Sequence, residues 1–385
     1  MKSLLLIFWA SIFVLFNCFG NTFKKGHSMV GIDITANLIG TGSSVAQCLN
    51  VFSPETFAII SGMGNISVVK FEKGAINLAK INDHSFESPC KKYFSLPGDK
   101  YLWGFGIRDF QILDLSSGIQ QTYLLSHNGN DMIYSTTVVD TTDLKIWIDI
   151  VHHSFKKTDS NDISIIFDVI QNKVIDTIYG YGGFIFLLHD NMTLCELFDA
   201  PKPTTWKISS ELIYDQKDNE LTKKLSNLGI SAYPESFSPK NMFMIGNYNT
   251  EDGTNNLASV KWDPSYEDIS IQPFTYQQEK DIVLWEQFEI SPDGRWAKTV
   301  ARDYSTEKRT DDITFYAVND SFPQSLSPPV YGGRSTRDGG GCFVETDDWG
   351  TVYVDISPEA PGYLVVYKMS DVMNKVVEKM RNMVR

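Results

Sequence analysis

The sequence predicts an all-β protein in which seven four-stranded sheets pack around an axis as a β-propeller, followed by a C-terminal α-helix. Three observations support this fold. Short apolar runs bounded by Gly, Asn, Asp or Ser recur along the chain. A turn built on Ser-Pro or a similar pair returns roughly every forty to fifty-five residues, which is the length of one blade. Aromatic residues make up 13% of the 385 residues, and they favour strands.

The clearest copy of the repeated turn lies in residues 288–297, which read Phe-Glu-Ile-Ser-Pro-Asp-Gly-Arg-Trp-Ala. In such a turn proline presets φ, aspartate bonds the turn backbone and glycine takes a positive φ. Weaker anchors follow the same pattern at Ser53, Ser95, Ser238 and Thr346, with two further units expected around residues 140–143 and 189–191. This gives seven units, and six or eight remain compatible because those two units match by pattern only.

A propeller explains the repeat better than a sandwich, because a sandwich does not contain seven similar units of this length in one chain. A single blade cannot bury both of its faces, so blades pack against one another and the ring closes. Residues 29–34 form a strand-like segment before the first unit. We expect this segment to complete the last blade, so that one propeller domain covers residues 29–369.

Two helices interrupt the strand pattern. The first would be an insertion between the fourth and fifth units, capped by Asp218 and ended by Gly229. The second is expected over residues 370–385, where apolar residues spaced by four and three form a stripe. That stripe contains Met369, Met373, Val376, Met380 and Met383. It either packs on the rim of the propeller or docks a partner, in which case Met373 and Met380 are binding residues.

The first twenty residues have the features of an export signal. Lys2 gives a positive start, and residues 4–16 form an apolar-rich stretch that suits a signal core but is short for a membrane span. We expect cleavage after Gly20, with lipid attachment at Cys18 or an uncleaved anchor as the alternatives. The sequence therefore predicts an exported protein of the periplasm, the cell envelope or the extracellular space.

Four cysteines remain after this signal: Cys48, Cys90, Cys195 and Cys342. In an oxidising compartment they could pair as disulfides in three ways, or they could be buried thiols. None lies in a CxxC pair, so we expect neither a zinc site nor any other metal or cofactor. The net charge of −13 argues against nucleic acid and anionic lipid as partners, because both require a basic face.

Two motifs resemble known propellers. Ser291-Pro292-Asp293-Gly294-Arg295-Trp296 resembles the repeat of TolB-like propellers, and the repeat pattern as a whole is similar to WD-repeat-like propellers. Residues 346–353, Thr-Asp-Asp-Trp-Gly-Thr-Val-Tyr, resemble the Asp-box hairpin of sialidases and related propellers. These resemblances imply a fold rather than an activity. The chain contains no G-x-S-x-G nucleophile elbow, which a hydrolase domain of the oligopeptidase type would need.

The segment 331–341, Tyr-Gly-Gly-Arg-Ser-Thr-Arg-Asp-Gly-Gly-Gly, is the most unusual in the sequence. Glycines at this density indicate a loop where a ligand or another part of the backbone approaches closely. Arg334, Arg337 and Asp338 are the candidate binding residues there. The alternative is a connection between blades near the axis, where side chains do not fit.

These patterns favour non-catalytic recognition of an envelope protein, a peptide or a glycan, and they assign no catalytic residue. The alternative is a propeller glycoside hydrolase or lyase with its site at the central channel, because propellers host both kinds of function. An enzyme predicts at least two acids converging with an arginine, a histidine or a metal at one mouth of the channel. A binding module predicts an apolar or aromatic rim without titratable groups of strongly perturbed pKa.

Overall fold

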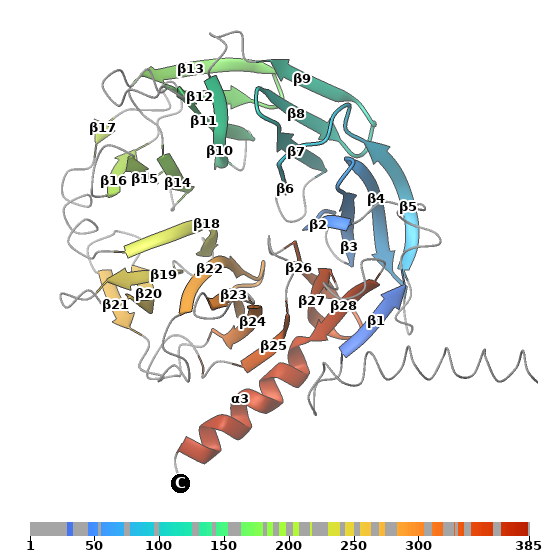
Figure 1. Ribbon diagram of the computed structural model, residues 1–385, viewed down its shortest axis with the longest axis vertical. Helices are drawn as coiled ribbons and strands as arrows, with labels where there is room; N and C mark the ends of the chain where they lie inside the picture. Colours follow the sequence, from blue (N-terminus) through green and yellow to red (C-terminus); the bar gives the residue numbers. More distant parts are fainter. Residues whose placement is uncertain are drawn as a thin grey trace, which may run out of the picture.

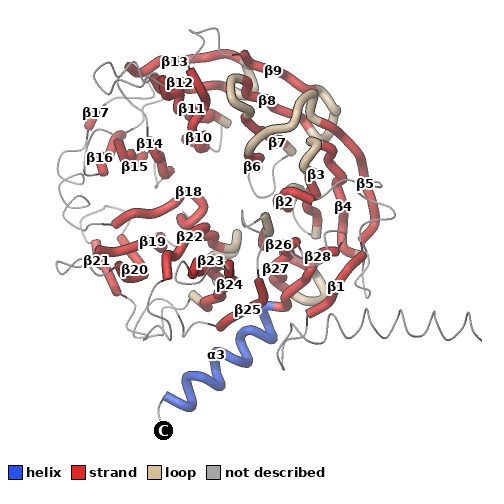
Figure 2. The backbone as a smooth tube through the Cα atoms, viewed as in Figure 1, coloured by secondary structure: helices blue, strands red, loops and turns tan. Residues whose placement is uncertain are grey.

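The computed structural model describes residues 29–33, 45–52, 55–72, 78–95, 100–124, 131–140, 144–152, 163–179, 183–187, 192–197, 203–207, 216–217, 230–238, 243–249, 255–262, 269–273, 283–303, 310–318, 327, 330–334, 340–356 and 363–383. Figure 1 shows its sheets following one another around a common centre as a ring, with the helix α3 (Met369–Met383) leaving the ring at one side. The backbone tube in Figure 2 shows that strands make up nearly all of this ring. The predicted all-β propeller with a C-terminal helix is therefore confirmed.

The described strands form seven four-stranded antiparallel sheets, six of them built from four consecutive strands. The first two sheets are β2 (Val45–Asn50), β3 (Thr56–Ser61), β4 (Asn65–Phe71), β5 (Leu78–Ser85), and β6 (Lys92–Ser95), β7 (Tyr101–Phe105), β8 (Asp109–Asp114), β9 (Gln120–Leu124). The next two are β10 (Asp131–Asp140), β11 (Lys145–His152), β12 (Ile163–Asp168), β13 (Lys173–Tyr179), and β14 (Gly183–Leu187), β15 (Met192–Leu197), β16 (Pro203–Lys207), β17 (Gln216–Lys217). Two more follow with β18 (Ile230–Ser238), β19 (Phe243–Asn249), β20 (Asn255–Trp262), β21 (Ile269–Pro273), and β22 (Val283–Ile290), β23 (Trp296–Asp303), β24 (Thr310–Ala317), β25 (Val330–Arg334).

The last sheet joins the two ends of the described chain. It contains β26 (Cys342–Thr346), β27 (Gly350–Ile356) and β28 (Tyr363–Lys368), and its outer strand is β1 (Met29–Asp33). β1 pairs antiparallel with β28, with Met29 opposite Tyr367 and Asp33 opposite Tyr363. The expected closure of the ring by residues 29–34 is therefore confirmed. We call this sheet the closing sheet.

The hydrophobic core lies between neighbouring sheets rather than within any one of them. One cluster joins the closing sheet to β2–β5 and includes Phe57, Val69 and Val354, all 0% exposed. Other clusters join β2–β5 to β6–β9, β6–β9 to β10–β13, and β22–β25 to the closing sheet. Because a middle strand is covered on both faces, β3 is buried at every position, and its residues 57–60 form a continuous apolar run. The outer strand β5 is mostly exposed.

The repeated turn joins the first and second strands of a sheet. In its clearest copy the Ser291 hydroxyl accepts a hydrogen bond from the Trp296 amide at 3.0 Å, and Asp293 Oδ1 accepts one from the Arg295 amide at 3.0 Å. Gly294 has a φ of 70°, as the sequence predicts. The residues directly before β3 and β11, Glu55 (φ 66°) and Leu144 (φ 47°), also have a positive φ, where a side chain adopts the left-handed conformation at a cost of about 1–2 kcal/mol. Ser53 and residues 189–191 lie outside the described residues.

The helix α3 packs on the propeller itself. Met369, Val372 and Val376 are 0 to 4% exposed and belong to the cluster between β22–β25 and the closing sheet. Met373 and Met380 are half-buried against the same cluster, whereas Met383 is 62% exposed. The structure therefore favours packing on the rim over a free docking stripe. The other predicted helix, between Asp218 and Gly229, lies outside the described residues.

Candidate functional site

One end of the ring carries a firmly held connection between the first two sheets. Because strands alternate in direction, the linker 86–91 from β5 to β6 lies at the same end as the hairpins β3–β4 and β7–β8. Backbone bonds join these segments: the Phe86 amide donates to Gly64 O at 3.0 Å, and the Lys91 amide donates to Phe105 O at 2.7 Å. We call the linker together with these two hairpins the linker platform.

A buried amide organises the polar groups of the linker platform. Gln111 is 0% exposed, and its Nε2 lies 2.6 Å from Asp109 Oδ2 and 2.6 Å from Ser88 Oγ. Its Oε1 accepts a hydrogen bond from Gln120 Nε2 at 2.8 Å. Gln120 Oε1 in turn accepts one from the Glu87 amide at 3.1 Å. The linker is thus tied to three residues of the second sheet, so its shape is set before any partner arrives.

Cys90 is part of this linker and is unsuited to nucleophilic chemistry. Its amide donates a hydrogen bond to Tyr93 Oη at 2.9 Å, and a side chain at Gly104 would come within 2.8 Å of Cys90 Sγ. Gly104 therefore makes room for the thiol. Burial, with the charge of Asp109, raises the pKa of Cys90 to about 12. A catalytic cysteine requires the opposite shift, because the thiolate is the nucleophile.

The surface of the linker platform combines apolar and basic side chains. Met63, at the tip of the β3–β4 hairpin, is 65% exposed, and Ile107, in the β7–β8 hairpin, is 55% exposed. Lys91, Lys92 and Arg108 are exposed on the same end of the ring. A monomeric protein exposes single apolar residues routinely, and here two such residues lie on neighbouring hairpins at one end of the ring.

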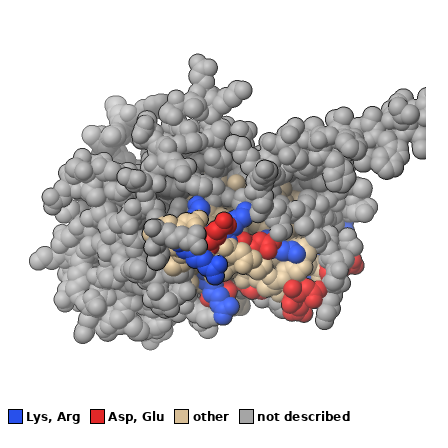
Figure 3. Space-filling model, turned by 90° about the horizontal axis from the view of Figure 1, so that it is seen from below, with Lys and Arg blue, Asp and Glu red and all other residues tan. Residues whose placement is uncertain are grey.

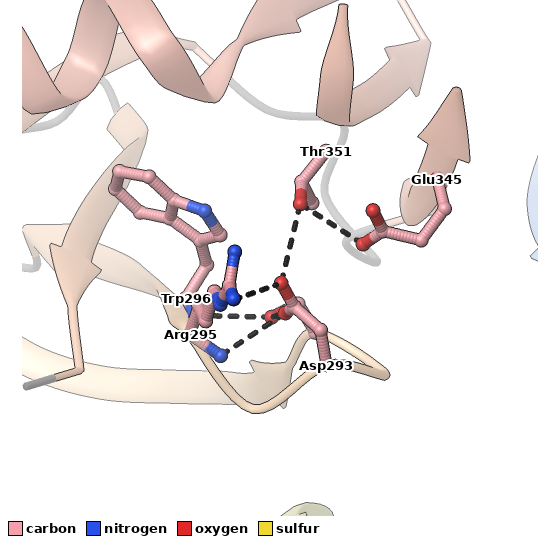
Figure 4. A network of polar contacts seen from close by, with 6 residues as sticks. Asp293, Arg295, Trp296, Glu345 and Thr351 are labelled. Carbon is pink, nitrogen blue, oxygen red and sulfur yellow. Dashed lines mark hydrogen bonds and ion pairs between the residues drawn. The ribbon is translucent and has the colours of Figure 1, made fainter. Parts of the chain in front are cut away.

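A second polar group lies at the opposite end, where β22–β25 meets the closing sheet. Thr351 Oγ1 lies 2.9 Å from Glu345 Oε1 and 3.5 Å from Asp293 Oδ2, so the hydroxyl sits between two carboxylates. Arg295 pairs with Asp293 at 3.7 Å, with 81% of its side chain exposed (Figure 4). Two acids and an arginine therefore do converge, at the hairpins β22–β23 and β26–β27 of neighbouring sheets, whereas the enzyme alternative requires such a group at a mouth of the channel. Thr351, which is 9% exposed, occupies the position between the acids that a substrate oxygen would need.

Similar contacts hold the closing sheet to β2–β5. The Glu55 amide donates to Glu345 O at 2.7 Å, and Glu55 Oε1 accepts from the Asp347 amide at 3.1 Å. Asn50 Nδ2 donates to Phe343 O at 2.8 Å. Glu55 is 7% exposed, and these bonds explain why it tolerates a positive φ. The acids at this end therefore act in joining neighbouring sheets.

Ionisable groups are also buried along the closing sheet. Lys298, 1% exposed, pairs with Glu289 at 3.7 Å, and its Nζ lies 5.3 Å from the centre of the Tyr353 ring. Glu289 Oε1 accepts a hydrogen bond from the Phe343 amide at 3.2 Å, so the pair also joins two sheets. Burial, with the charge of Asp355, raises the pKa of Tyr353 well above its usual value.

The side chains of three cysteines are described, and none of them forms a disulfide in this structure. Cys48, Cys90 and Cys342 are free, and burial raises the pKa of both Cys48 and Cys342. No disulfide joins these three in the structure, Cys48 and Cys342 belong to one apolar cluster, as the buried-thiol alternative expects, and a disulfide in an oxidising compartment stays a prediction. Cys195 lies in β15, and its side chain is outside the described part.

The glycine-rich segment is described only in part. Arg334 ends β25 without a described side chain, and Arg337 and Asp338 lie outside the described residues. Gly341 fits the close-approach alternative, because a side chain there would collide with Val354 O and the Tyr353 hydroxyl. The assignment of these three residues to a binding site therefore stays a prediction.

Sequence reasoning missed the linker platform. Gln111 lies in an apolar strand and Met63 in a plain hairpin, so neither stands out in the sequence. The two glycines of Gly104-Phe105-Gly106 were a sequence signal of close packing at the end of a strand. In the structure, a side chain at Gly106 would collide with Asp109.

The described residues contain no group of three or more His, Cys, Asp or Glu side chains placed to hold a metal ion. Among the helices in the described part, none is both long and apolar enough to cross a membrane. From the side of α3, Figure 3 shows acidic and basic side chains together on the described surface.

No family model matches the sequence, and no curated protein matches it. Solved structures do match the fold. The β-propeller domain of Cps50 (Swd1) from Myceliophteria thermophila is 10% identical, with a TM-score of 0.52, and the match covers 88% of this chain and 99% of that one. U3-55K is 13% identical over 89% and 99% of the two chains, with a TM-score of 0.49. The Neurospora crassa Pan2 WD40 domain is 9% identical over 90% and 96%, with a TM-score of 0.48. The first of these matches shows that the chain shares the β-propeller fold, and the TolB-like resemblance stays a prediction.

Proposed function

We propose that this protein is a non-catalytic interaction module that binds a protein partner through the linker platform. The observation that supports this is the exposure of Met63 and Ile107 on hairpins fixed against a hydrogen-bonded linker. A surface that is rigid before binding loses little conformational entropy on association. The polar groups beneath it, centred on Gln111, bond to one another.

Affinity capture with matched variants tests this proposal. Met63→Ser with Ile107→Ser removes both apolar contacts, while Ile170→Ser removes a side chain of similar exposure, 62%, from the opposite end of the ring. A partner captured by the unaltered chain and by the Ile170 variant, but not by the double variant, supports the proposal. Equal capture by all three proteins contradicts it.

A second candidate function is carbohydrate hydrolysis, favoured by the convergence of Asp293, Glu345 and Arg295. Glycosidases use two carboxylates, and a retaining enzyme holds them about 5–5.5 Å apart. Turnover of aryl glycosides by the full chain, abolished in both Asp293→Asn and Glu345→Gln, would support this function. Absence of turnover in a panel of α- and β-linked substrates would contradict this function. Asp293 and Glu345 would then serve only to connect neighbouring sheets.

Export and residence in the cell envelope belong to the same proposal. They rest on the apolar-rich segment 4–16 and on Lys2. The expected partner is then another envelope or extracellular protein or a peptide, with glycan as the alternative ligand and lipid attachment at Cys18 as the alternative to cleavage.

A further inference from the structure

The ring closes at the interface between the closing sheet and β2–β5, which we call the seam. On the outer side, β1 pairs with β28 through the backbone. On the inner side, β2 and β26 lie next to each other near the centre of the ring (Figure 1). Because the closing sheet combines strands from both ends of the described chain, the ring depends on contacts at the seam to stay closed.

Two cysteines lie on the inner strands of the seam. Cys48 belongs to β2, and Cys342 is the first residue of β26. Their side chains are 0% and 4% exposed, and both belong to the apolar cluster that joins the two sheets. Cys90 packs instead against the cluster between β2–β5 and β6–β9. Among the cysteines whose side chains are described, Cys48 and Cys342 are therefore the pair that one cluster brings together.

Hydrogen bonds hold β2 against the start of β26 on both sides of Cys342. The Cys48 amide donates to Gly340 O, two residues before Cys342. Asn50 Nδ2 donates to Phe343 O, one residue after it, at 2.8 Å. A disulfide requires two Cα atoms within about 7 Å of each other, and backbones joined as neighbouring strands lie about 5 Å apart. The backbone at the seam therefore suits a cross-link at these positions.

The two thiols also influence each other. After burial, the charge of Cys48 is the largest cause that raises the pKa of Cys342, which is the effect of a nearby like charge. Burial raises the pKa of both thiols, so neither readily forms the thiolate that exchange reactions need. A reaction of these cysteines with a disulfide donor therefore takes place before the ring closes, or when the seam opens.

We propose that Cys48 and Cys342 form a disulfide that fastens the seam, made by exchange with a donor that is itself a disulfide. The thiolate of one cysteine attacks the donor disulfide, which releases one donor thiolate and leaves a mixed disulfide. The second thiolate attacks the mixed disulfide, forms the Cys48–Cys342 bond and releases the other donor thiolate. The cysteine pair thus loses two electrons and two protons, and the donor gains both as two thiols.

The bond would link residues that are separated in sequence by almost the whole ring. A cross-link of this kind restricts the unfolded chain strongly, so the oxidised protein should resist urea better than the reduced one. In the cell, the donor belongs to the oxidising compartment that the proposed export implies. The bond acts on the stability of the ring and goes beyond the proposed function, so its failure leaves the linker platform unaffected.

Incubation of the purified full chain with glutathione disulfide, in urea just below the unfolding midpoint, tests the pairing. Free thiols are then blocked with N-ethylmaleimide, and a protease digest is analysed by mass spectrometry without reduction. The expected product is a linked pair of peptides that contains Cys48 and Cys342. N-ethylmaleimide or single glutathione adducts on both cysteines, or linkage of either one to Cys90 or Cys195, would overturn the proposal.

Stability against urea provides a second measurement. The oxidised chain should unfold at a urea concentration higher by about 0.5 M or more than the same protein in dithiothreitol. Cys90→Ser, the matched control, should keep this difference, whereas Cys48→Ser and Cys342→Ser should lose it. Each variant is compared with itself, so any stability lost through the serine cancels. A difference that persists in the Cys48 and Cys342 variants, or that is absent from the unaltered chain, contradicts a disulfide at the seam.

Discussion

The packing of α3 gives the most sharply defined stability prediction. Val376 and Val377 are neighbours in the helix, yet Val376 is 0% exposed and Val377 is 38% exposed. Val376 lies in the cluster formed by β22–β25 and the closing sheet, which also contains Phe315 and Tyr367. Changing each valine to alanine removes the same two methyl groups and gives the same gain in helix propensity. The difference between the two variants therefore isolates burial.

The magnitude follows from the loss of buried apolar groups. Two buried methyl groups correspond to about 1.6 kcal/mol of transfer free energy, and the cavity left behind adds to this. We expect Val376→Ala to lower the free energy of unfolding by about 2 kcal/mol more than Val377→Ala does. Urea denaturation followed by tryptophan fluorescence measures both. Values for the two variants that agree within about 0.5 kcal/mol would refute the packing of α3 on the ring.

Three other predictions concern the closing sheet, pH and export. Gly341→Ala should lower the free energy of unfolding by about 1–3 kcal/mol, because its new methyl group would collide with Val354 O and the Tyr353 hydroxyl; an unchanged urea midpoint would contradict this close approach. Burial acts to raise the pKa of Asp114, but hydrogen bonds from the Ser116 amide and Lys100 outweigh it and lower that pKa, so Asp114→Asn should be less stable than the unaltered chain at pH 7. That difference should shrink as the pH falls through the lowered pKa, and a difference constant from pH 7 to pH 2 would rule out the linkage. In a secreting host, mass spectrometry of the purified protein should find a chain that begins at Asn21; a chain that retains residues 1–20 would exclude cleavage, and a lipid-modified Cys18 would replace it.

The repeated turn allowed the fold to be predicted from the sequence because its residues have a local physical role. Ser291, Asp293 and Gly294 act within one turn, so their meaning does not depend on distant parts of the chain. The same is true of α3, where the four-and-three spacing of apolar residues predicted a helix that begins at Met369, one residue before the expected start.

The candidate site could not be predicted in this way. Gln111 and Ser88 are 23 residues apart, and their contact depends on how two sheets pack. The glycine-rich segment attracted attention because of its composition, yet Gly341 is explained by the close approach of β27. Cys48 and Cys342 came together through ring closure, which no local pattern reveals. Composition thus indicated where the backbone is crowded, whereas the linker platform depends on side chains that are unremarkable in sequence.

The central claim is that a protein partner contacts the linker platform, and site-specific photo-crosslinking tests it most directly. A benzophenone amino acid is placed at Met63, at Ile107 or at Ile170, in the full chain and in the native host. The account predicts crosslinks to the same partner from positions 63 and 107 and none to that partner from position 170, which lies at the other end of the ring. Crosslinking to the partner from position 170 alone, or equally from all three positions, would contradict it.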